Sequence, residues 1–424
     1  MTNDNLNLLN EAISSGIISL SDVQEKLMMT KKQRALNKHK YNIWEGKTGY
    51  WYTYLPCDNN SAKRRQIKRK SKTELEEAII NYYIGDDEQE QYKKVTLKSL
   101  YHEWLDYKSL HTNASSSIRR IDCDWTKYYL NDPIIHIPLV QMDSLMLDKW
   151  THKKIKDYEM TRTEYYNMSI ILRQSLIYAV DKKILKESPF KNVKINTKLL
   201  RKVKKKDDHT QVYLNDEQKL IEQEAWKDFH SDTSCTTPLA VLLDFQTGLR
   251  IGELVALKWS DIKGNYVQIR RMEVRQEKLN DDNTWNKADL VLVDHVKTNA
   301  GYRKVYLTKE AKHILHEVRK SYMRRGLNSE FIFIDKQEQR IHKYAVDKRI
   351  RKYCKYIGIS PKSMHKARKT YISTLIDAGV NINTIRSLAG HESEETTYKN
   401  YCFDRMVDKQ KEDLLERALT HHAR

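Results

Sequence analysis

Apolar residues recur every three or four positions over two stretches of the N-terminal half, and this spacing predicts amphipathic helices. In residues 1–36 it indicates one helix and then a second, which Ser19 is placed to cap. In residues 94–190 it indicates four or five successive helices, the last of which is stopped at Pro189. These helices predict a bundle over 94–190. The expected apolar faces of its first and last helices contain Leu97, Leu100, Trp104, Leu105 and Leu110, and Ile171, Leu172, Leu176, Ile177 and Val180.

Between these stretches the period of the pattern changes to two, which indicates strands. Residues 41–55 predict a hairpin, and residues 63–70 predict a third strand. Thr73 is placed to cap a helix that follows. A sheet of three strands with one helix over 37–85 is too small for a robust free-standing core. The acidic residues 85–91 predict a linker after it.

Residues 212–424 alternate helix-like stretches with short strand-like ones, and the last third is helical again. The predicted strands cover residues 266–270, 290–293, 303–307 and 331–334. The predicted helices cover residues 238–245, 251–257, 309–325 and 341–357. The expected fold class is therefore α+β and mainly α, with a small antiparallel sheet in this last domain.

The net charge of the chain indicates which class of partner it binds. The chain of 424 residues has 76 Lys and Arg against 57 Asp and Glu, a formal net charge of +19. A surplus of this size favours a polyanion such as nucleic acid. The residues 191–211 predict a basic linker. The candidate DNA-binding residues are Lys63, Arg64, Arg65, Lys68, Arg69 and Lys70 in the third strand, and Arg201, Lys202, Lys204, Lys205 and Lys206 in the linker.

Other classes are disfavoured by the composition. No apolar run approaches the roughly 20 residues that span a membrane. The first ten residues lack the basic-then-apolar pattern of a signal peptide. The five cysteines are scattered and form no C-x-x-C pair, which favours a reducing cytoplasm over disulfides or a structural zinc site. We therefore expect a cytoplasmic protein with no metal site.

Chemistry-bearing residues cluster in the last domain. An arginine follows a Thr-Gly turn and opens an apolar helix, which is an unusual place for a charge. A lysine lies at the tip of a hairpin that is predicted from the strands 290–293 and 303–307. A His-x-x-Arg pair, a histidine after Leu-Ala-Gly and a tyrosine follow. The candidates are Arg250, Lys297, His365, Arg368, His391 and Tyr401.

This order resembles the catalytic domain of the tyrosine recombinases, the integrase family of phages and conjugative transposons, most clearly over 212–424. The resemblance implies cleavage and rejoining of DNA through a 3′-phosphotyrosine, without metal or nucleotide cofactor. It implies Tyr401 as the nucleophile, with Tyr398 as its rival, and Lys297 as the general acid, with Lys287 and Lys304 as alternatives. The acidic residue expected to orient the site from behind is Glu253.

The side-chain types of these residues suit the cleavage of a phosphodiester. Two arginines can fork onto the phosphate oxygens, and a histidine can move a proton near neutral pH. The family often has Asp-Leu inside its His-x-x-Arg pair, where this chain has Lys366 and Ala367. The extra charge leaves the spacing intact.

The rest of the chain fits the same resemblance. Residues 37–85 are similar to an arm-type DNA-binding domain, 94–190 to a core-DNA-binding domain, and 212–424 to the catalytic domain. The implied partners are double-stranded DNA attachment sites and three further copies in a tetramer, with the amphipathic tail beyond Cys402 docked on the next copy. Whether an accessory excisionase or DNA-bending protein takes part stays open. The alternatives are a DNA-binding regulator without cleavage and a metal-dependent transposase, for which no convincing trio of carboxylates is found.

Overall fold

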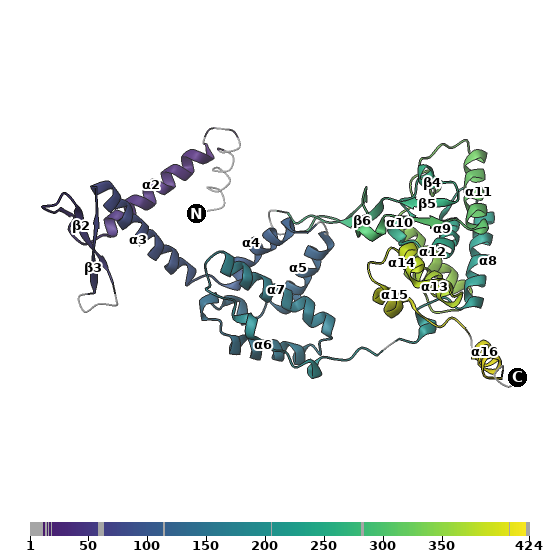
Figure 1. The fold of residues 1–424 in the computed structure, drawn as a ribbon. Helices are drawn as coiled ribbons and strands as arrows, with labels where there is room; N and C mark the ends of the chain where they lie inside the picture. Colours follow the sequence, from purple (N-terminus) through teal and green to yellow (C-terminus); the bar gives the residue numbers. More distant parts are fainter. Residues whose placement is uncertain are drawn as a thin grey trace. The chain divides into compact units, whose positions relative to one another are not determined.

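The structure is a computed structural model whose two compact units, Met1–Lys202 and Val203–Arg424, are described separately (Figure 1). Most of the first helix predicted in 1–36, and Lys205 of the basic linker, lie outside the residues that it describes. The described residues are 12, 15, 17, 19–57, 63–112, 115–204, 206–280, 284–406 and 408–420.

A three-stranded antiparallel sheet in the first unit confirms the predicted strands of 37–85. Its order is β1-β2-β3, and Thr53 of β2 lies opposite Ile67 of β3. Leu55, Leu75 and Ile79 form its small core. The elements are α2 (Leu20–Lys38), β1 (Trp44–Glu45), β2 (Trp51–Pro56), β3 (Arg64–Arg69) and α3 (Lys72–Tyr92).

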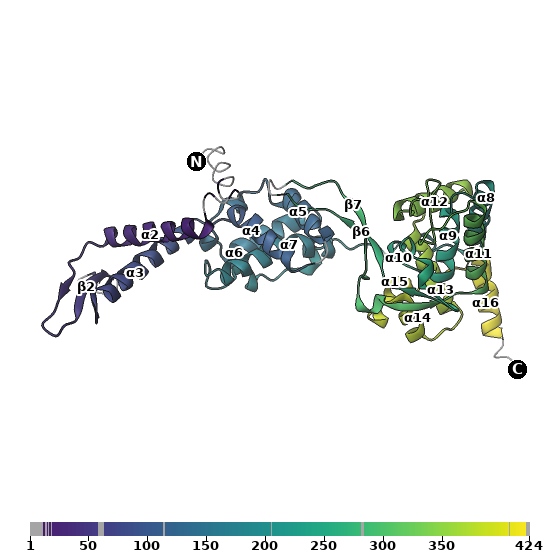
Figure 2. The same cartoon turned by 90° about the horizontal axis from the view of Figure 1, so that it is seen from above.

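Helix boundaries here differ from the prediction in three places. Helix α3 begins at Lys72, so Thr73 lies within it and is not its cap. Helix α3 continues through 85–91, so the linker predicted there is wrong. The acidic stretch is rich in Glu and Gln, which are good helix formers, and extending an existing helix needs no new nucleus. Helix α2 runs past residue 36 and lies against α3 (Figure 2), with Leu36 on the small core.

Four α-helices over 97–181 confirm the predicted bundle. Tyr101, Trp125 and Tyr129 stack as parallel rings in its core, with Tyr101 and Trp125 centroids 3.8 Å apart. Leu110 is 81% exposed and Ile177 is 53% exposed, so these two were wrongly assigned to the buried faces. The helices are α4 (Leu97–Leu110), α5 (Ser115–Tyr128), α6 (Ser144–Asp157) and α7 (Arg162–Asp181).

Helix α9 (Thr237–Thr247) is the centre of the second unit. Nearly every one of its residues is buried, and five helices, α8, α10, α11, α12 and α13, contact it. Apart from Asp244, Gln246 and the threonines at its two ends, its sequence is apolar, as a largely enclosed helix requires. The other helices are α8 (Asn215–Ser231), α10 (Ile251–Leu254), α11 (Lys309–Arg324), α12 (Lys343–Tyr356), α13 (Met364–Asp377), α14 (Ile382–Ala389), α15 (Glu394–Tyr401) and α16 (Asp408–Thr420).

The strands of this unit form two small antiparallel sheets, where one was predicted. One has the order β4-β5-β8, and the other pairs β6 with β7. The strands predicted at 290–293 and 303–307 are present, but they pair with β6 and β5 and not with each other. Residues 331–334 make only isolated bridges. The strands are β4 (Ile262–Lys263), β5 (Tyr266–Ile269), β6 (Met272–Gln276), β7 (Asp289–Val293) and β8 (Arg303–Tyr306).

Strand β6 was missed because Arg275 and Gln276 end it and two arginines precede it, so its apolar alternation is short. Among the described residues, no helix has the length and apolarity needed to cross a membrane.

Candidate active site

A left-handed turn at the end of α9 places the first arginine. Gly248 has φ +57°, and a Cβ there would lie 2.2 Å from the ring of Tyr371, so only glycine fits. Its N–H donates to the carbonyl of Asp244 at 2.7 Å and closes the helix. Arg250 then caps the short helix α10. The unusual position of this charge is therefore fixed by backbone geometry.

Arg250 is held by a buried acid. Its Nη1 donates to Glu253 Oε1 at 2.9 Å, and its Nη2 donates to the carbonyl of Gly390 at 2.9 Å. Burial by itself would raise the pKa of Glu253, but the guanidinium of Arg303, and then those of Arg250 and Arg368, lower it below its ordinary value. Glu253 is thus an ionised carboxylate beneath the first arginine.

Arg368 is almost completely buried, at 1% exposure. Its Nη1 donates to the carbonyl of Gly248 at 2.6 Å, and its Nη2 donates to the carbonyl of Ala389 and lies 3.1 Å from His391 Nε2. These acceptors fix the plane of the guanidinium. Both arginines are therefore positioned by the same two turns. Arg250 follows the Gly248 turn and bonds Gly390, and Arg368 bonds the carbonyls of Gly248 and Ala389.

The tautomer of His391 follows from its neighbours. Arginine has only donors, so Nε2 of His391 accepts from Arg368, and Nδ1 carries the hydrogen that it donates to Thr397 Oγ1 at 3.0 Å. Burial, then the charges of Arg368, Arg250 and Arg303, lower the pKa of His391 to about 3. The ring is therefore neutral at pH 7.

His365 and Tyr401 face each other across the cleft. Their ring centroids are 5.9 Å apart, and those of His391 and Tyr401 are 4.6 Å apart. His365 is exposed in the cleft, yet its partial withdrawal from bulk water, and then the charges of Lys369, Arg368 and Arg250, lower its pKa to about 4. It is therefore an unprotonated base at neutral pH.

The competing tyrosine lies elsewhere. Tyr401 is 9% exposed and lies in the cleft, with the Cζ of Arg368 5.8 Å from its ring centroid. Tyr398 is 53% exposed and does not line the cleft. The structure therefore brings Tyr401, and not its rival, to the arginines.

Of the three lysine candidates, one lines the cleft and two do not. Lys297 lines the cleft, in the connection between β7 and β8, although these strands do not form the hairpin that was expected. Lys287 and Lys304 are exposed and do not line it. All six candidates therefore line one cleft, whose residues are Leu249, Arg250, Ile251, Lys297, Thr298, His365, Arg368, Gly390, His391, Glu392, Thr396 and Tyr401.

Sequence reasoning missed two side chains here. Arg303 is buried beneath the cleft and contacts Glu253, and Thr397 accepts from His391. Arg303 alternates with exposed residues along β8, so its inward position could have been found from the strand period. Thr397 lies between the half-buried Thr396 and the exposed Tyr398 on a short helix and gives no such signal.

The basic residues of the N-terminal sheet form an exposed surface with aromatic rings. Lys63, Arg64, Arg65, Lys68, Arg69 and Lys70 are all exposed. Arg64 lies 4.6 Å from the centroid of Tyr54, and Lys68 lies 5.2 Å from that of Tyr50. Trp44 stacks on Tyr52. Arginine and lysine over aromatic faces provide both charge and flat surface.

The basic residues of the linker 191–211 do not all lie on one unattached segment. Arg201 packs back on its own unit, where its N–H donates to the carbonyl of Met160 at 2.9 Å and its Nε donates to that of Glu159 at 3.0 Å. Lys202 is exposed. In the second unit, Lys204 and Lys206 line a pocket with Lys366. Arg201 is exposed, as expected of the linker, but its hydrogen bonds to backbone carbonyls hold it against its own unit.

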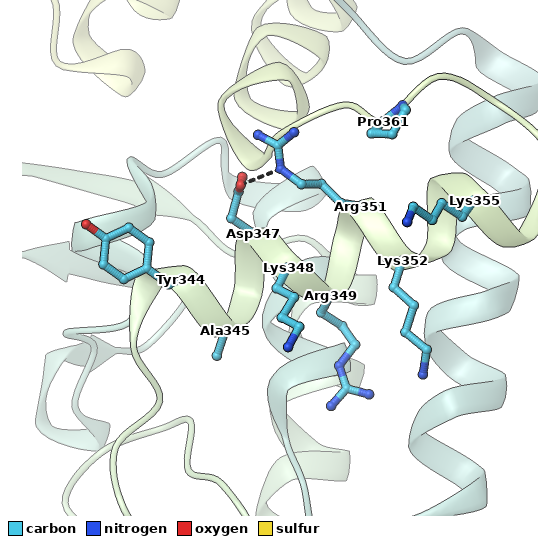
Figure 3. A pocket seen from close by; sticks show the side chains of 9 residues that line it. All are labelled: Tyr344, Ala345, Asp347, Lys348, Arg349, Arg351, Lys352, Lys355 and Pro361. Atoms are coloured by element: carbon cyan, nitrogen blue, oxygen red, sulfur yellow. Dashed lines mark hydrogen bonds and ion pairs between the residues drawn. The ribbon is translucent and has the colours of Figure 1, made fainter.

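A further basic surface on α12 was not predicted. Its exposed face carries Tyr344, Lys348, Lys352 and Lys355, at the i, i+4 and i+3 spacing of one helix face. Figure 3 shows Lys348 and Lys352 pointing the same way into a pocket, while Arg351 pairs with Asp347. The helical spacing of these lysines was visible in the sequence, but the face that they occupy was not.

Among the described residues, no group of three or more His, Cys, Asp and Glu side chains is arranged to hold a metal ion.

The low pKa of His391 predicts that acid destabilises the second unit. A folded pKa near 3 against 6.5 when unfolded means that the unfolded state binds the proton first, so stability falls as pH drops below about 6.5. From about pH 7.5 to about pH 5.5 the loss from this one group is about 1.4 kcal/mol. Urea unfolding across this range measures it. His391→Gln should make the profile less steep but not flat, because His365, whose pKa is lowered to about 4, contributes a similar slope. An equally steep profile in that variant would contradict the assignment.

Comparisons with known proteins agree with this geometry. Residues 211–406 match the phage integrase family. A XerC-like tyrosine recombinase of Caldanaerobacter subterraneus subsp. tengcongensis is 23% identical over 371 residues, which are 85% of this chain and 92% of that protein. The chain belongs to the tyrosine recombinase family. This recombinase is a DNA strand-transferring enzyme of site-specific recombination, and the alternatives of a regulator and a metal-dependent transposase are not favoured.

Solved structures show the same fold for the recombinase. A Tn1549 transposon integrase fragment, in complex with transposon right end DNA, is 17% identical with a TM-score of 0.54, over 76% of this chain and 99% of that one. A lambda integrase tetramer bound to a Holliday junction is 16% identical with a TM-score of 0.51, over 87% of this chain and 97% of that one.

Proposed function

We propose that Tyr401 is the nucleophile with which this recombinase cuts DNA, leaving a 3′-phosphotyrosine and a free 5′-hydroxyl. The observation that carries this assignment is the convergence of six candidate side chains on one cleft, with Tyr401 beside the buried Arg368. A tyrosyl ester stores the energy of the broken phosphodiester, so rejoining needs no nucleotide.

The proposed step divides the work among the cleft residues. The Tyr401 hydroxyl attacks the phosphorus, a Tyr–O–P bond forms, and the bond to the 5′ oxygen breaks. Neutral His365 is the candidate acceptor for the tyrosine proton, and Lys297 donates a proton to the leaving oxygen. Arg250 and Arg368 bind the non-bridging oxygens, where negative charge grows in the transition state.

Strand exchange completes the reaction. The free 5′-hydroxyl of a partner duplex attacks the phosphotyrosine, and Tyr401 leaves. Four copies acting in pairs through a four-way junction would exchange all strands, and the fold shared with the lambda integrase tetramer on a Holliday junction supports this arrangement. The attachment-site DNA would contact the basic surfaces of both units.

The test is covalent capture in excess chelator. A nicked duplex with an attachment site loses a short fragment after cleavage, so the phosphotyrosine cannot be resealed and accumulates. We expect a covalent band whose yield is unchanged by the chelator, because two arginines supply the charge that a metal would supply. A band that requires added divalent metal would contradict the proposed mechanism.

We also propose that the exposed face of α12 contacts phosphates of the same DNA. An α-helix with lysines on its outer face fits against a duplex, and each phosphate contact releases counterions. Lys348→Gln combined with Lys352→Gln should weaken binding and reduce the slope of log affinity against log salt by about 2.

A matched control lies on α11. Lys312 and Lys320 are also exposed lysines of the second unit. Replacing both by Gln removes the same charge, and we expect a slope change below about half of that seen on α12. Equal changes for the two pairs, measured by fluorescence anisotropy over a salt series, would show only a general effect of net charge.

A further inference from the structure

Arg303, on β8, is a buried guanidinium whose donors reach three separate segments. Its Nε donates to the carbonyl of Leu388 at 2.7 Å, its Nη1 to the carbonyl of Gly301 at 3.0 Å, and its Nη2 to Glu253 Oε2 at 2.7 Å. The side chain is 3% exposed. It therefore does not face the DNA itself.

Each acceptor belongs to a segment that presents a cleft residue. Gly301 ends the short 3-10 turn after Lys297 and Thr298. Leu388 lies in the last turn of α14, just before the Gly390 turn that presents His391. Glu253 binds Arg250. One side chain thus links the lysine segment, the histidine turn and the first arginine.

The segments also pack tightly around it. A Cβ on Gly390 would lie 2.9 Å from the carbonyl oxygen of Ala300 and 3.2 Å from Nη1 of Arg303. The histidine turn therefore rests directly on the lysine segment and on the guanidinium. A displacement of either segment would be transmitted to the other, because close-packed groups transmit strain.

A role limited to balancing the charge of Glu253 does not account for this geometry. A lysine could neutralise that carboxylate, but its single ammonium cannot also reach two carbonyls that lie in different directions. The rigid planar fork of arginine can.

We propose that Arg303 is a positioning residue that holds the Lys297 segment in register with Arg250 and His391, so that the leaving oxygen is protonated where the phosphate is bound. This inference rests on the proposed role of Lys297 as general acid. Arg303 acts through the segments that it ties and does not itself touch the DNA.

The test separates protonation of the leaving group from the rest of the site. In a substrate whose bridging 5′ oxygen is sulfur, the leaving thiolate is far less basic than an alkoxide and needs no general acid. We expect Lys297→Met, Arg303→Lys and Arg303→Gln to slow single-turnover cleavage of the oxygen substrate by about 10²-fold or more. With sulfur, each should come within about tenfold of wild type.

Arg340→Gln is the matched control, because Arg340 is a part-buried arginine that pairs with the buried Glu273 at 2.6 Å elsewhere in the same unit. Its effect on cleavage should be the same for both substrates. Thermal unfolding of every variant shows how much of each loss is stability, and Arg303→Lys retains a cation for Glu253 should Arg303→Gln fail to fold.

Two results would overturn the inference in distinguishable ways. If sulfur rescues Lys297→Met but not the Arg303 variants, Arg303 does not position the acid, and the proposed function stands. If Lys297→Met cleaves the oxygen substrate at the wild-type rate, the assignment of Lys297 fails and the inference fails with it.

Discussion

Replacing Tyr401 by phenylalanine should abolish the covalent protein–DNA band, whereas Tyr398→Phe should keep its yield within about threefold of wild type. Phenylalanine retains the ring that packs with Ile372, Ile385 and Ala389 and lacks only the nucleophilic oxygen. The loss should therefore appear in chemistry and not in stability. Tyr398 is exposed outside the cleft, so its hydroxyl has no access to the bound phosphate.

The measurement uses the nicked substrate and a denaturing gel, with DNA affinity and thermal unfolding as controls. Both variants should bind the duplex and unfold as the wild type does. Loss of the band only in Tyr398→Phe would move the nucleophile by three residues and leave the class of reaction unchanged. A full band in Tyr401→Phe would refute the proposed mechanism.

The sequence identified the cleft residues because each stands in a local pattern that survives folding. The Thr-Gly turn before Arg250 and the Gly before His391 both require a left-handed glycine, and both are found, at φ +57° and +64°. The three-residue spacing of His365 and Arg368 places both on the cleft side of α13. The roles of these residues in the reaction stay predictions.

Long-range pairing could not be predicted in the same way. The strands at 290–293 and 303–307 are adjacent in sequence and were taken for neighbours, yet each pairs with an earlier strand. Short strands bury few side chains, so their own pattern specifies a partner weakly. Lys297 consequently lies in a connection between two sheets, and the importance of Arg303 appears only once Leu388 and Glu253 are placed beside it.

Boundaries at charged stretches were the other source of error. Residues 85–91 are polar enough for a linker but equally compatible with helix, and the packed start of α3 decides in favour of helix. Arg201 shows the converse, because a residue in a strongly basic stretch is held by the backbone carbonyls of Glu159 and Met160. Charge density alone therefore does not distinguish an unattached linker from one that packs on a folded unit.

The second large effect is expected from Arg368→Lys, which should slow covalent capture by roughly 10³-fold or more while DNA affinity changes by less than about threefold. One ammonium cannot reproduce a fork that bonds the carbonyls of Gly248 and Ala389 and still faces the phosphate. Affinity depends on many phosphate contacts, whereas the transition state depends on this one.

Loss of these buried hydrogen bonds will also lower the free energy of unfolding, by about 1–3 kcal/mol for each carbonyl left unpaired. The control variant must therefore lose a comparable amount of stability. Arg405→Lys provides this control, because Arg405 is also buried and bonds Thr374, Gln218 and the carbonyl of Tyr213 outside the cleft. Both variants should unfold at a lower urea concentration than wild type. Only Arg368→Lys should lose the covalent band, because Arg368, unlike Arg405, lines the cleft where the charge of the scissile phosphate develops. Equal losses of cleavage in the two variants would assign Arg368 to the fold and not to the reaction.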